Sequence, residues 1–456
     1  GNSDKGKNNL TGTATVTAKN TTIKLAGKAD GVIGGGIAID DSQADKTNAI
    51  VKTEGTSTIN VYDGAEVSKL NFEPLEILAG KAPESGIDMG SYVAAAKDAA
   101  ENIAIAGGGV AIGGGAESLV KESVINVNGG TVAGDIVAGG VAVYGFGTNG
   151  GSTVEKSTIN LNAGKVEGNV FAGGSVSDIT TGSAGYDQAK ATVGNSTINL
   201  NGAEVAGFIS GLGVSGKDND KAASSTLNVK GNNTLAALAD GGSKIVGFNQ
   251  VNFASDSVTT ITGLKAGNDK AFIDAKGGVI TVSEGAKLDI SKLDKVADKD
   301  YFIADNYADT SRLWNEDELA YDRTEGFATV VEDKDNKDYK VTYKELEKLT
   351  EEEQNKAVES MENALGEYGG QVRGILEGIV KDGKDTNEGA KDFISDLTKD
   401  TSDVSADLRT GMLFGEVAGV TSNSVSMATD FADNAALRLS FTQDKVNGED
   451  KVAEEG

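Results

Sequence analysis

The sequence contains no cysteine and no histidine. Without cysteine, the chain can form neither disulfides nor thiolate metal sites. Without histidine, it lacks the commonest general base, the commonest transition-metal ligand and every Ser-His or Cys-His arrangement. Catalysis by carboxylates needs neither residue, so these absences alone do not decide against an enzyme. We assign no catalytic residue, no cofactor and no metal site to this chain.

Proline, aromatic residues and long apolar runs are also scarce. The 456 residues include two prolines and 5% aromatic residues, against 62 glycines. No stretch approaches the roughly 18 consecutive apolar residues of a membrane-spanning helix. Acidic residues outnumber basic ones, and the formal net charge is −27. This charge argues against nucleic acid or anionic lipid as a partner, because both bind to concentrated positive surfaces.

One phrase recurs along the first half of the chain and determines the predicted fold. Its clearest copy is TINLNAGKVEGNVFAGGSVS at 158–177, and further copies begin at residues 22, 58, 124, 197 and 226. The apolar residues of TINLN point to one face of a strand and the asparagines to the other. The second residues of the copies are Ile23, Ile59, Ile125, Ile159, Ile198 and Leu227, which gives intervals of 36, 66, 34, 39 and 29 residues by subtraction. A period of roughly 30 to 40 residues predicts a solenoid, here a parallel β-helix.

Each turn is expected to contain three short strands joined by tight turns. The segments 40–57, 113–123, 144–157 and 178–196 vary in length and are predicted to be loops. The glycine runs at 34–36, 107–109 and 113–115 lack the context of a phosphate loop, so tight turns are the better interpretation. The matching asparagines either line a ligand groove or stack as an amide ladder, and we favour the ladder. They are Asn60, Asn126, Asn160, Asn199 and Asn228.

The interval of 66 residues is too long for one turn. We interpret 70–101 as an insertion that leaves the coil, with an additional degenerate turn as the alternative, and predict a short helix over 91–102 with Ser91 as its N-cap. Recognition often occurs on irregular loops held by a rigid scaffold. The candidate binding residues are therefore Phe72, Leu75, Ile77, Met89 and Tyr92. These side chains either pack back on the coil or form a patch that faces a partner.

The repeat loosens near residue 242, and the character of the chain changes near residue 331. We divide the sequence into β-helix repeats at 1–242, closing β-helix turns at 243–331, and an α-helical region with an acidic, mobile tail at 332–456. The helical prediction depends on a seam with alternating spacings of three and four, and a third helix is expected over 417–439. The seam consists of Val358, Met361, Leu365, Tyr368, Val372, Ile375 and Ile379.

The segment DKDNKD at 333–338 faintly resembles a calcium-binding loop. An EF-hand would need an oxygen ligand and a carboxylate where Lys337 and Lys344 stand. We therefore interpret this segment as a solvated connector.

The glycine-rich TINLN…VxGNVFAGG turns, the absence of cysteine and the looser closing strands together resemble the passenger region of Gram-negative type V autotransporters. The resemblance covers about residues 10–330 and is one of style and period, without a signature residue. It implies a right-handed parallel β-helix displayed at the cell surface, with 243–331 as an end cap. It also implies an outer-membrane barrel C-terminal to this fragment as the export route. The helical region is longer than the single linker helix of the family, and the resemblance gives it no role.

Three functions are compatible with these patterns. The leading hypothesis is a non-enzymatic passenger that mediates adhesion to a host-cell or matrix surface, or self-association. The second is a structural stalk or coat spacer. The third is a carboxylate-dependent polysaccharide lyase or hydrolase, which is disfavoured because no pair of carboxylates can be assigned the separation of about 5 Å that retaining glycosidases need.

Overall fold

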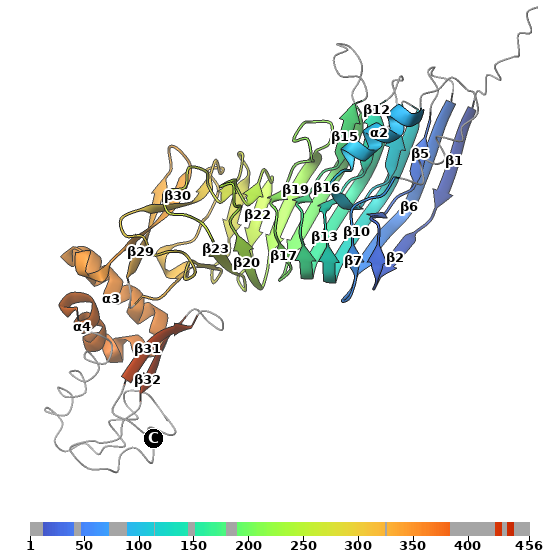
Figure 1. Ribbon diagram of the computed structural model, residues 1–456. Coiled ribbons are helices and arrows are strands. Elements are labelled where there is room, and N and C mark those ends of the chain that lie inside the picture. Colours follow the sequence, from blue (N-terminus) through green and yellow to red (C-terminus); the bar gives the residue numbers. More distant parts are fainter. Residues whose placement is uncertain are drawn as a thin grey trace, which may run out of the picture.

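The computed structural model describes residues 12–40, 47–72, 89–113, 115–144, 151–178, 189–323, 326–383, 425–430 and 436–441. About half of the described residues belong to strands, and most strands lie in long parallel sheets along an elongated body (Figure 1). The prediction of a mainly β chain is confirmed. The arrangement is consistent with a β-helix.

Sheet A is the longest sheet, and its main path runs β1-β6-β10-β13-β16-β19-β22-β25. The strands of this path are β1 (Gly12–Ala18), β6 (Thr47–Val61), β10 (Ala116–Val132), β13 (Gly151–Val166), β16 (Lys190–Leu200), β19 (Ala222–Val229), β22 (Gln250–Phe253) and β25 (Val279–Val282). Four shorter strands pair beside it, namely β2 (Thr21–Leu25), β3 (Lys28–Ala29), β7 (Glu66–Val67) and β17 (Glu204–Val205). Neighbours in this sheet are parallel and belong to successive turns of the chain.

Three further sheets form the other sides of the coil. Sheet B contains β4 (Val32–Ile33), β8 (Ile103–Ala106), β11 (Asp135–Val137), β14 (Val170–Phe171), β18 (Ile209–Ser210), β21 (Ile245–Val246), β24 (Ile273–Asp274), β27 (Asp300–Asp305), β30 (Asp338–Lys344) and β29 (Phe327–Asp333). Sheet C contains β5 (Ile37–Ile39), β9 (Val110–Ile112), β12 (Val141–Tyr144) and β15 (Ser175–Asp178). Sheet D contains β20 (Asn232–Ala236), β23 (Val258–Thr262), β26 (Lys287–Asp289) and β28 (Leu319–Ala320).

The repeated phrase stacks in register from turn to turn. Ile125 pairs with Ile59 on one side and with Ile159 on the other, and Ile159 pairs with Ile198. All four side chains are fully buried, so the predicted stack of equivalent apolar residues is confirmed. Because Ile59 and Ile125 are direct neighbours, the 66-residue interval is a single turn that carries an insertion.

The strands of sheet A are longer than the sequence pattern predicts. Residues 47–57, 116–123, 151–157 and 190–196 belong to β6, β10, β13 and β16, so the prediction of loops there is wrong. Several inward positions in these segments are serines, including the buried Ser118, Ser152 and Ser157. An apolar and polar alternation is the main sequence signal of a strand, and here small polar residues replace the apolar ones.

The glycine runs form a corner that stacks between sheets B and C. The amide of Gly35 donates to the carbonyl of Gly108 (3.0 Å), and the amide of Gly108 donates to the carbonyl of Gly139 (2.9 Å). A Cβ atom on Gly109 would lie 2.2 Å from the backbone carbonyl oxygen of Gly36, which leaves no room for a side chain. The corner therefore requires glycine for close approach of the backbone, in agreement with the prediction of tight turns.

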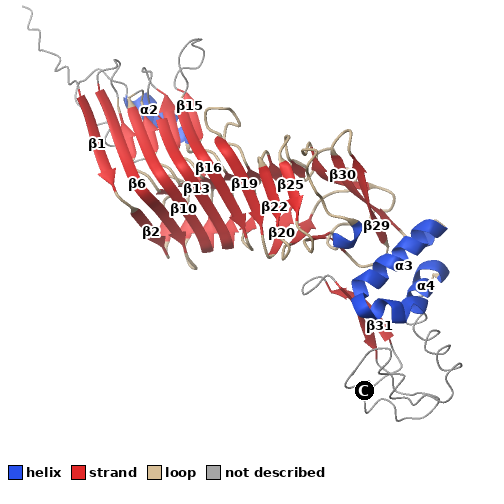
Figure 2. Cartoon of the chain, turned by 180° about the vertical axis from the view of Figure 1, so that it is seen from behind, coloured by secondary structure: helices blue, strands red, loops and turns tan. Residues whose placement is uncertain are grey.

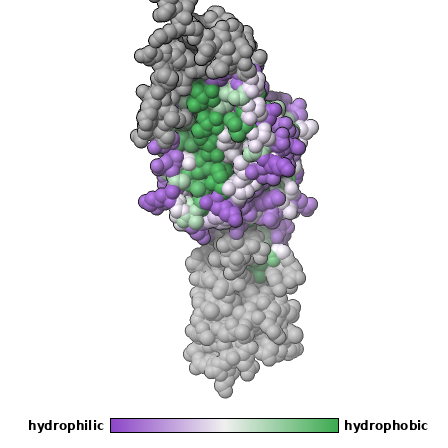
Figure 3. All heavy atoms as spheres, turned by 90° about the vertical axis from the view of Figure 1, so that its right-hand side faces the viewer, coloured by the Kyte–Doolittle hydropathy of each residue, from purple (hydrophilic) through white to green (hydrophobic). Residues whose placement is uncertain are grey.

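The two ends of the coil differ. At the C-terminal end, the antiparallel hairpin β29–β30 pairs with β27, and Trp314, Tyr321 and Tyr339 are buried nearby. Bulky side chains are expected where a final turn must be covered. At the N-terminal end, the strands β1 to β5 are paired on one side only among the described residues. Val16 is 66% exposed there, and Figure 3 shows an apolar patch on this end.

The helical region near the C-terminus is small. It contains the 3₁₀ segment η2 (Leu346–Lys348), α3 (Glu351–Leu365), the 3₁₀ segment η3 (Gly366–Val372) and α4 (Arg373–Asp382), and a further 3₁₀ segment, η1 (Glu316–Glu318), precedes it in the chain. Five seam residues are buried in one cluster, namely Val358, Met361, Val372, Ile375 and Ile379. The side chain of Tyr368 lies outside the described part. No helix among the described residues is long and apolar enough to cross a membrane.

The longer helical region predicted over 332–456 is not confirmed. Gly366 has a φ of +61° and ends α3, so the seam is not one continuous helix. The prediction of a helix over 417–439 is wrong where the chain is described, because β31 (Val425–Asp430) and β32 (Ala436–Phe441) pair there as an antiparallel hairpin. Leu437, Leu439 and Phe441 alternate with polar or basic residues, which is the period of a strand.

Candidate functional site

A row of asparagines follows the outer face of sheet A. From the second asparagine onward, each Nδ2 donates to Oδ1 of the asparagine on the preceding turn, at 2.7–2.9 Å. The row consists of Asn60, Asn126, Asn160, Asn199, Asn228 and Asn252. The predicted amide ladder is confirmed, and Asn252 extends it by one turn. Sequence reasoning missed Asn252 because the phrase has loosened there, although Val251 still pairs with Leu227 in the buried row.

A second row runs beside the asparagines, two residues earlier on each strand. It consists of Thr58, Val124, Thr158, Thr197, Thr226 and Gln250. We call the two rows together the ladder face. None of its twelve residues is charged, whereas a composition with 24% charged residues would place about three charges among them. The ladder face is therefore an uncharged polar strip on a strongly acidic protein.

Charged residues border the ladder face. At its N-terminal end Lys24 takes the ladder position, because it pairs in register with Asn60. Beside the threonine row, Lys156 forms an ion pair with Glu122 (2.9 Å), and Oγ1 of Thr56 donates to the same carboxylate (3.1 Å). The hydrogen bond from Lys156, followed by that from Thr56, lowers the pKa of Glu122. Glu122 is therefore ionised, and the positive charge of Lys156 balances its negative charge.

No described helix covers the ladder face. Figure 2 shows sheet A facing the viewer along its length. The helix α2 (Met89–Ala99) contacts β9, β12 and β15 instead, which places it on sheet C. Oγ of Ser175 donates to the carbonyl of Ala99 (2.6 Å) and fixes the end of this helix. A large ligand could therefore reach the ladder face from solvent.

The insertion packs against a different part of the coil. Phe72 is 4% exposed and lies in a cluster with Ala96, Ala99, Ile103 and Phe171. It therefore packs back on the coil, and the alternative of a partner-facing patch does not hold for this residue. The predicted helix is confirmed, but it begins at Met89, so Ser91 lies inside the helix rather than at its N-cap.

The remaining candidate residues of the insertion are less informative. Leu75 and Ile77 lie outside the described residues. Met89 and Tyr92 belong to α2, but their side chains are outside the described part. For these four residues, a binding role therefore stays a prediction.

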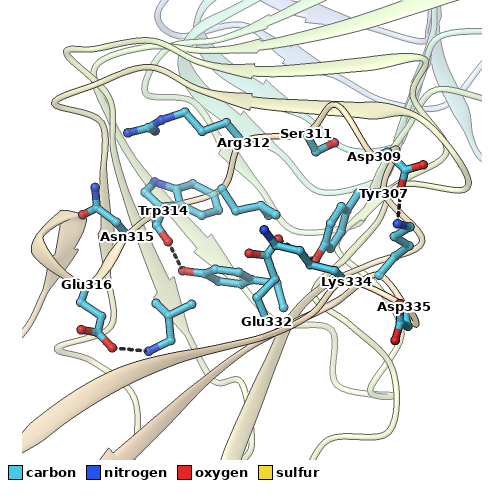
Figure 4. Close-up of a pocket in the computed structure, with 14 residues that line it drawn as sticks. Tyr307, Asp309, Ser311, Arg312, Trp314, Asn315, Glu316, Glu332, Lys334 and Asp335 are labelled. Atoms are coloured by element: carbon cyan, nitrogen blue, oxygen red, sulfur yellow. Dashed lines mark hydrogen bonds and ion pairs between the residues drawn. The ribbon is translucent and has the colours of Figure 1, made fainter. Parts of the chain in front are cut away.

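A cavity of about 680 Å³ lies between the last turn of the coil and the hairpin β29–β30 (Figure 4). Oη of Tyr339 donates to the carbonyl of Trp314 (2.8 Å), and Oη of Tyr307 donates to Glu332 (3.1 Å). Burial, and then the contact with Glu332, raises the pKa of Tyr307, so its phenol remains a hydrogen-bond donor. These contacts join the hairpin to the coil, and the cavity is best explained as part of the end cap.

The acidic segment at 333–338 forms the turn of the same hairpin. Oδ1 of Asp333 accepts hydrogen bonds from the amides of Asp335 and Asn336, both at 3.0 Å. The contacts with Asn336 lower the pKa of Asp333. This turn agrees with the prediction of a solvated connector. Within the described ranges, no group of three or more His, Cys, Asp or Glu side chains could hold a metal ion.

Comparison with known proteins does not identify a functional site, so the candidate surface is chosen from the geometry of the structure. No family model, curated protein or solved structure matches this chain. The asparagines of the ladder face recur on six successive turns of the described coil. The ladder face is therefore the principal candidate for a functional surface.

Proposed function

We propose that this chain is a non-enzymatic passenger, displayed at the surface of a Gram-negative cell, that mediates adhesion to host-cell or matrix surfaces or self-association. The ladder face is the observation that carries the proposal. It presents an asparagine on six successive turns, without charge and without a covering helix. A long surface of this kind can bind an extended or repetitive partner through many weak contacts that act together.

The proposed scaffold is a right-handed parallel β-helix of the type V autotransporter kind. The repeat phrase and the parallel register support it. The hand is supported by the general rule that crossovers between parallel neighbours of one sheet are right-handed in about 98% of cases. In this proposal, an outer-membrane barrel C-terminal to the fragment exports the passenger to the cell surface.

Catalysis is the weaker proposal for this surface. The ladder face offers amides and hydroxyls but no carboxylate, lysine or arginine among its twelve residues. General acid–base catalysis needs an ionisable group placed against the reacting bond. Binding without chemistry is the function that these groups support best.

A stalk is a second candidate, favoured by the elongated shape of the coil (Figure 1). Such a spacer would need only the rigid stack of turns, and its outer side chains would be free to vary in charge. The uniform composition of the ladder face favours adhesion over the stalk.

Beads coated with the purified chain provide the test. We expect these beads to attach to cultured cells or matrix-coated wells, or to aggregate with one another, more than uncoated beads do. The double variant T158R/T197R places two bulky cations in the middle of the ladder face and should abolish this behaviour. The matched variant T234R/T262R changes two threonines on sheet D and should retain it. Wild-type beads that neither attach nor aggregate would overturn the adhesion proposal and leave the stalk.

A further inference from the structure

We propose that the ladder face binds a neutral linear polysaccharide that lies along the axis of the coil, with about one sugar unit per turn. This inference rests on the proposed adhesive function and specifies the class of its ligand. It is carried by three properties of the ladder face: its spacing, its unused hydrogen-bonding groups and its lack of charge.

The spacing selects the kind of polymer. Equivalent side chains on neighbouring parallel strands lie about 4.8 Å apart, and side chains two residues apart on one strand about 6.6 Å apart. A polymer that contacts every turn must present polar groups at nearly the first of these distances. An extended polypeptide advances about 3.3 Å per residue and falls out of step with the turns. An extended polysaccharide advances by about the length of one sugar ring per unit. That length is close to the spacing of about 4.8 Å between neighbouring turns.

The asparagines keep hydrogen-bonding capacity after the ladder has formed. A primary amide has two N–H donors and an oxygen with two lone pairs. Each inner member, such as Asn126 or Asn160, uses one N–H and one lone pair in the ladder. One donor and one acceptor site per turn therefore remain for a ligand. The hydroxyls of Thr58, Thr158, Thr197 and Thr226 form no hydrogen bond with another described residue, and they add a second row of mixed donors and acceptors.

The lack of charge selects among polysaccharides. Sugar hydroxyls both donate and accept, so they match a row that does the same. A polyanion would find no cation among the twelve residues of the ladder face and would be repelled by a chain with a net charge of −27. A neutral polymer avoids this repulsion. Because its units are linked, weak contacts on six turns combine into a higher overall affinity.

Val124 supplies a reciprocal test, because it interrupts the four threonines of its row with a methyl group in place of a hydroxyl. Val124→Thr adds the missing hydroxyl, whereas Thr158→Val removes one from a neighbouring turn with little change in volume. Binding isotherms of the full chain on insoluble cellulose, chitin and linear mannan measure the effect, with alginate gel as the anionic comparison.

We expect the wild-type chain to bind at least one of the neutral polymers and not alginate. Thr158→Val should weaken that binding roughly two- to tenfold, the effect of one hydrogen bond, and Val124→Thr should strengthen it by a similar factor. Thr234→Val removes an exposed hydroxyl on sheet D and should leave binding unchanged. Circular dichroism identical to wild type shows that each variant is folded.

The outcomes separate this inference from the proposed function. Coated beads that attach to cells while the chain binds none of the neutral polymers would overturn the polysaccharide proposal and leave adhesion intact. Failure of both assays would overturn both. Polymer binding that survives T158R/T197R would place the site elsewhere. A dimer in sedimentation velocity that T158R/T197R converts to a monomer would show that the ladder face is buried between two copies, which also overturns the polysaccharide proposal.

Discussion

Replacing Asn160 with alanine removes the central member of the amide ladder. Asn160 donates to Oδ1 of Asn126 (2.7 Å) and accepts from Nδ2 of Asn199 (2.7 Å). A hydrogen bond contributes about 0.5–1.5 kcal/mol net, so the loss of two should lower the free energy of unfolding by about 1–3 kcal/mol. Asn60 lies at the N-terminal end of the ladder and makes one such bond, accepting from Nδ2 of Asn126 (2.8 Å). Its replacement should therefore cost about half as much.

Two measurements check this prediction. Guanidinium unfolding followed by far-ultraviolet circular dichroism gives the change in stability, and amide hydrogen exchange shows where it occurs. The second measurement is needed because a stacked solenoid can unfold in segments. Protection should fall mainly in β10, β13 and β16. Thr158→Ala on the same strand removes no ladder bond and should change stability by less than about 0.5 kcal/mol. A cost for Asn160→Ala no greater than that for Asn60→Ala would refute additivity of the ladder.

Two further predictions concern the corner and the core. Gly109→Ala places a Cβ 2.2 Å from the backbone carbonyl oxygen of Gly36 and should lower stability by about 1–3 kcal/mol or more. Gly27→Ala meets no atom within 4 Å and should be nearly neutral in the same denaturant titration. Lys244 is fully buried, and burial lowers its pKa from 10.5 to about 8. The unfolded state then binds the proton more tightly, so stability should rise as the pH increases from about 8 to about 10.5. Lys244→Met should remove this part of the rise in the denaturation midpoint, and an unchanged pH profile would contradict the assignment.

The coil could be predicted from the sequence because every turn repeats the same environment. An isoleucine that stacks on an isoleucine, and an asparagine that bonds to an asparagine, must recur with the period of the turn. The N-terminal halves of β6, β10, β13 and β16 could not be predicted from a repeated apolar pattern. Their inward residues, such as Ser118 and Ser152, are small and polar, and hydrogen bonds between turns hold these segments extended without an apolar alternation.

The candidate site could be predicted only in part. The asparagine row was visible in the sequence, but its exposure depends on the position of α2 over sheet C, which no local pattern encodes. In the sequence, Phe72 is a candidate because it is apolar and lies outside the repeat. A residue that packs on the coil and a residue that faces a partner share these two properties. The burial of Phe72 shows that it packs on the coil. The helical spacing of the seam ends before residues 425–430 and 436–441, where Leu437, Leu439 and Phe441 alternate with the period of a strand.

The one-sided pairing of the first turn has a mechanical consequence. When the coil is pulled along its axis, the strands of β1 to β5 have neighbours on one side only among the described residues, so rupture should begin at that end. Each later turn is held only by the turn after it once the preceding turn has peeled away. The turns between Ile125, Ile159, Ile198 and Leu227 contain 34, 39 and 29 residues by subtraction, and each would release roughly 100–140 Å of extended chain. Under load, the coil would lengthen in a series of steps and dissipate work at every one.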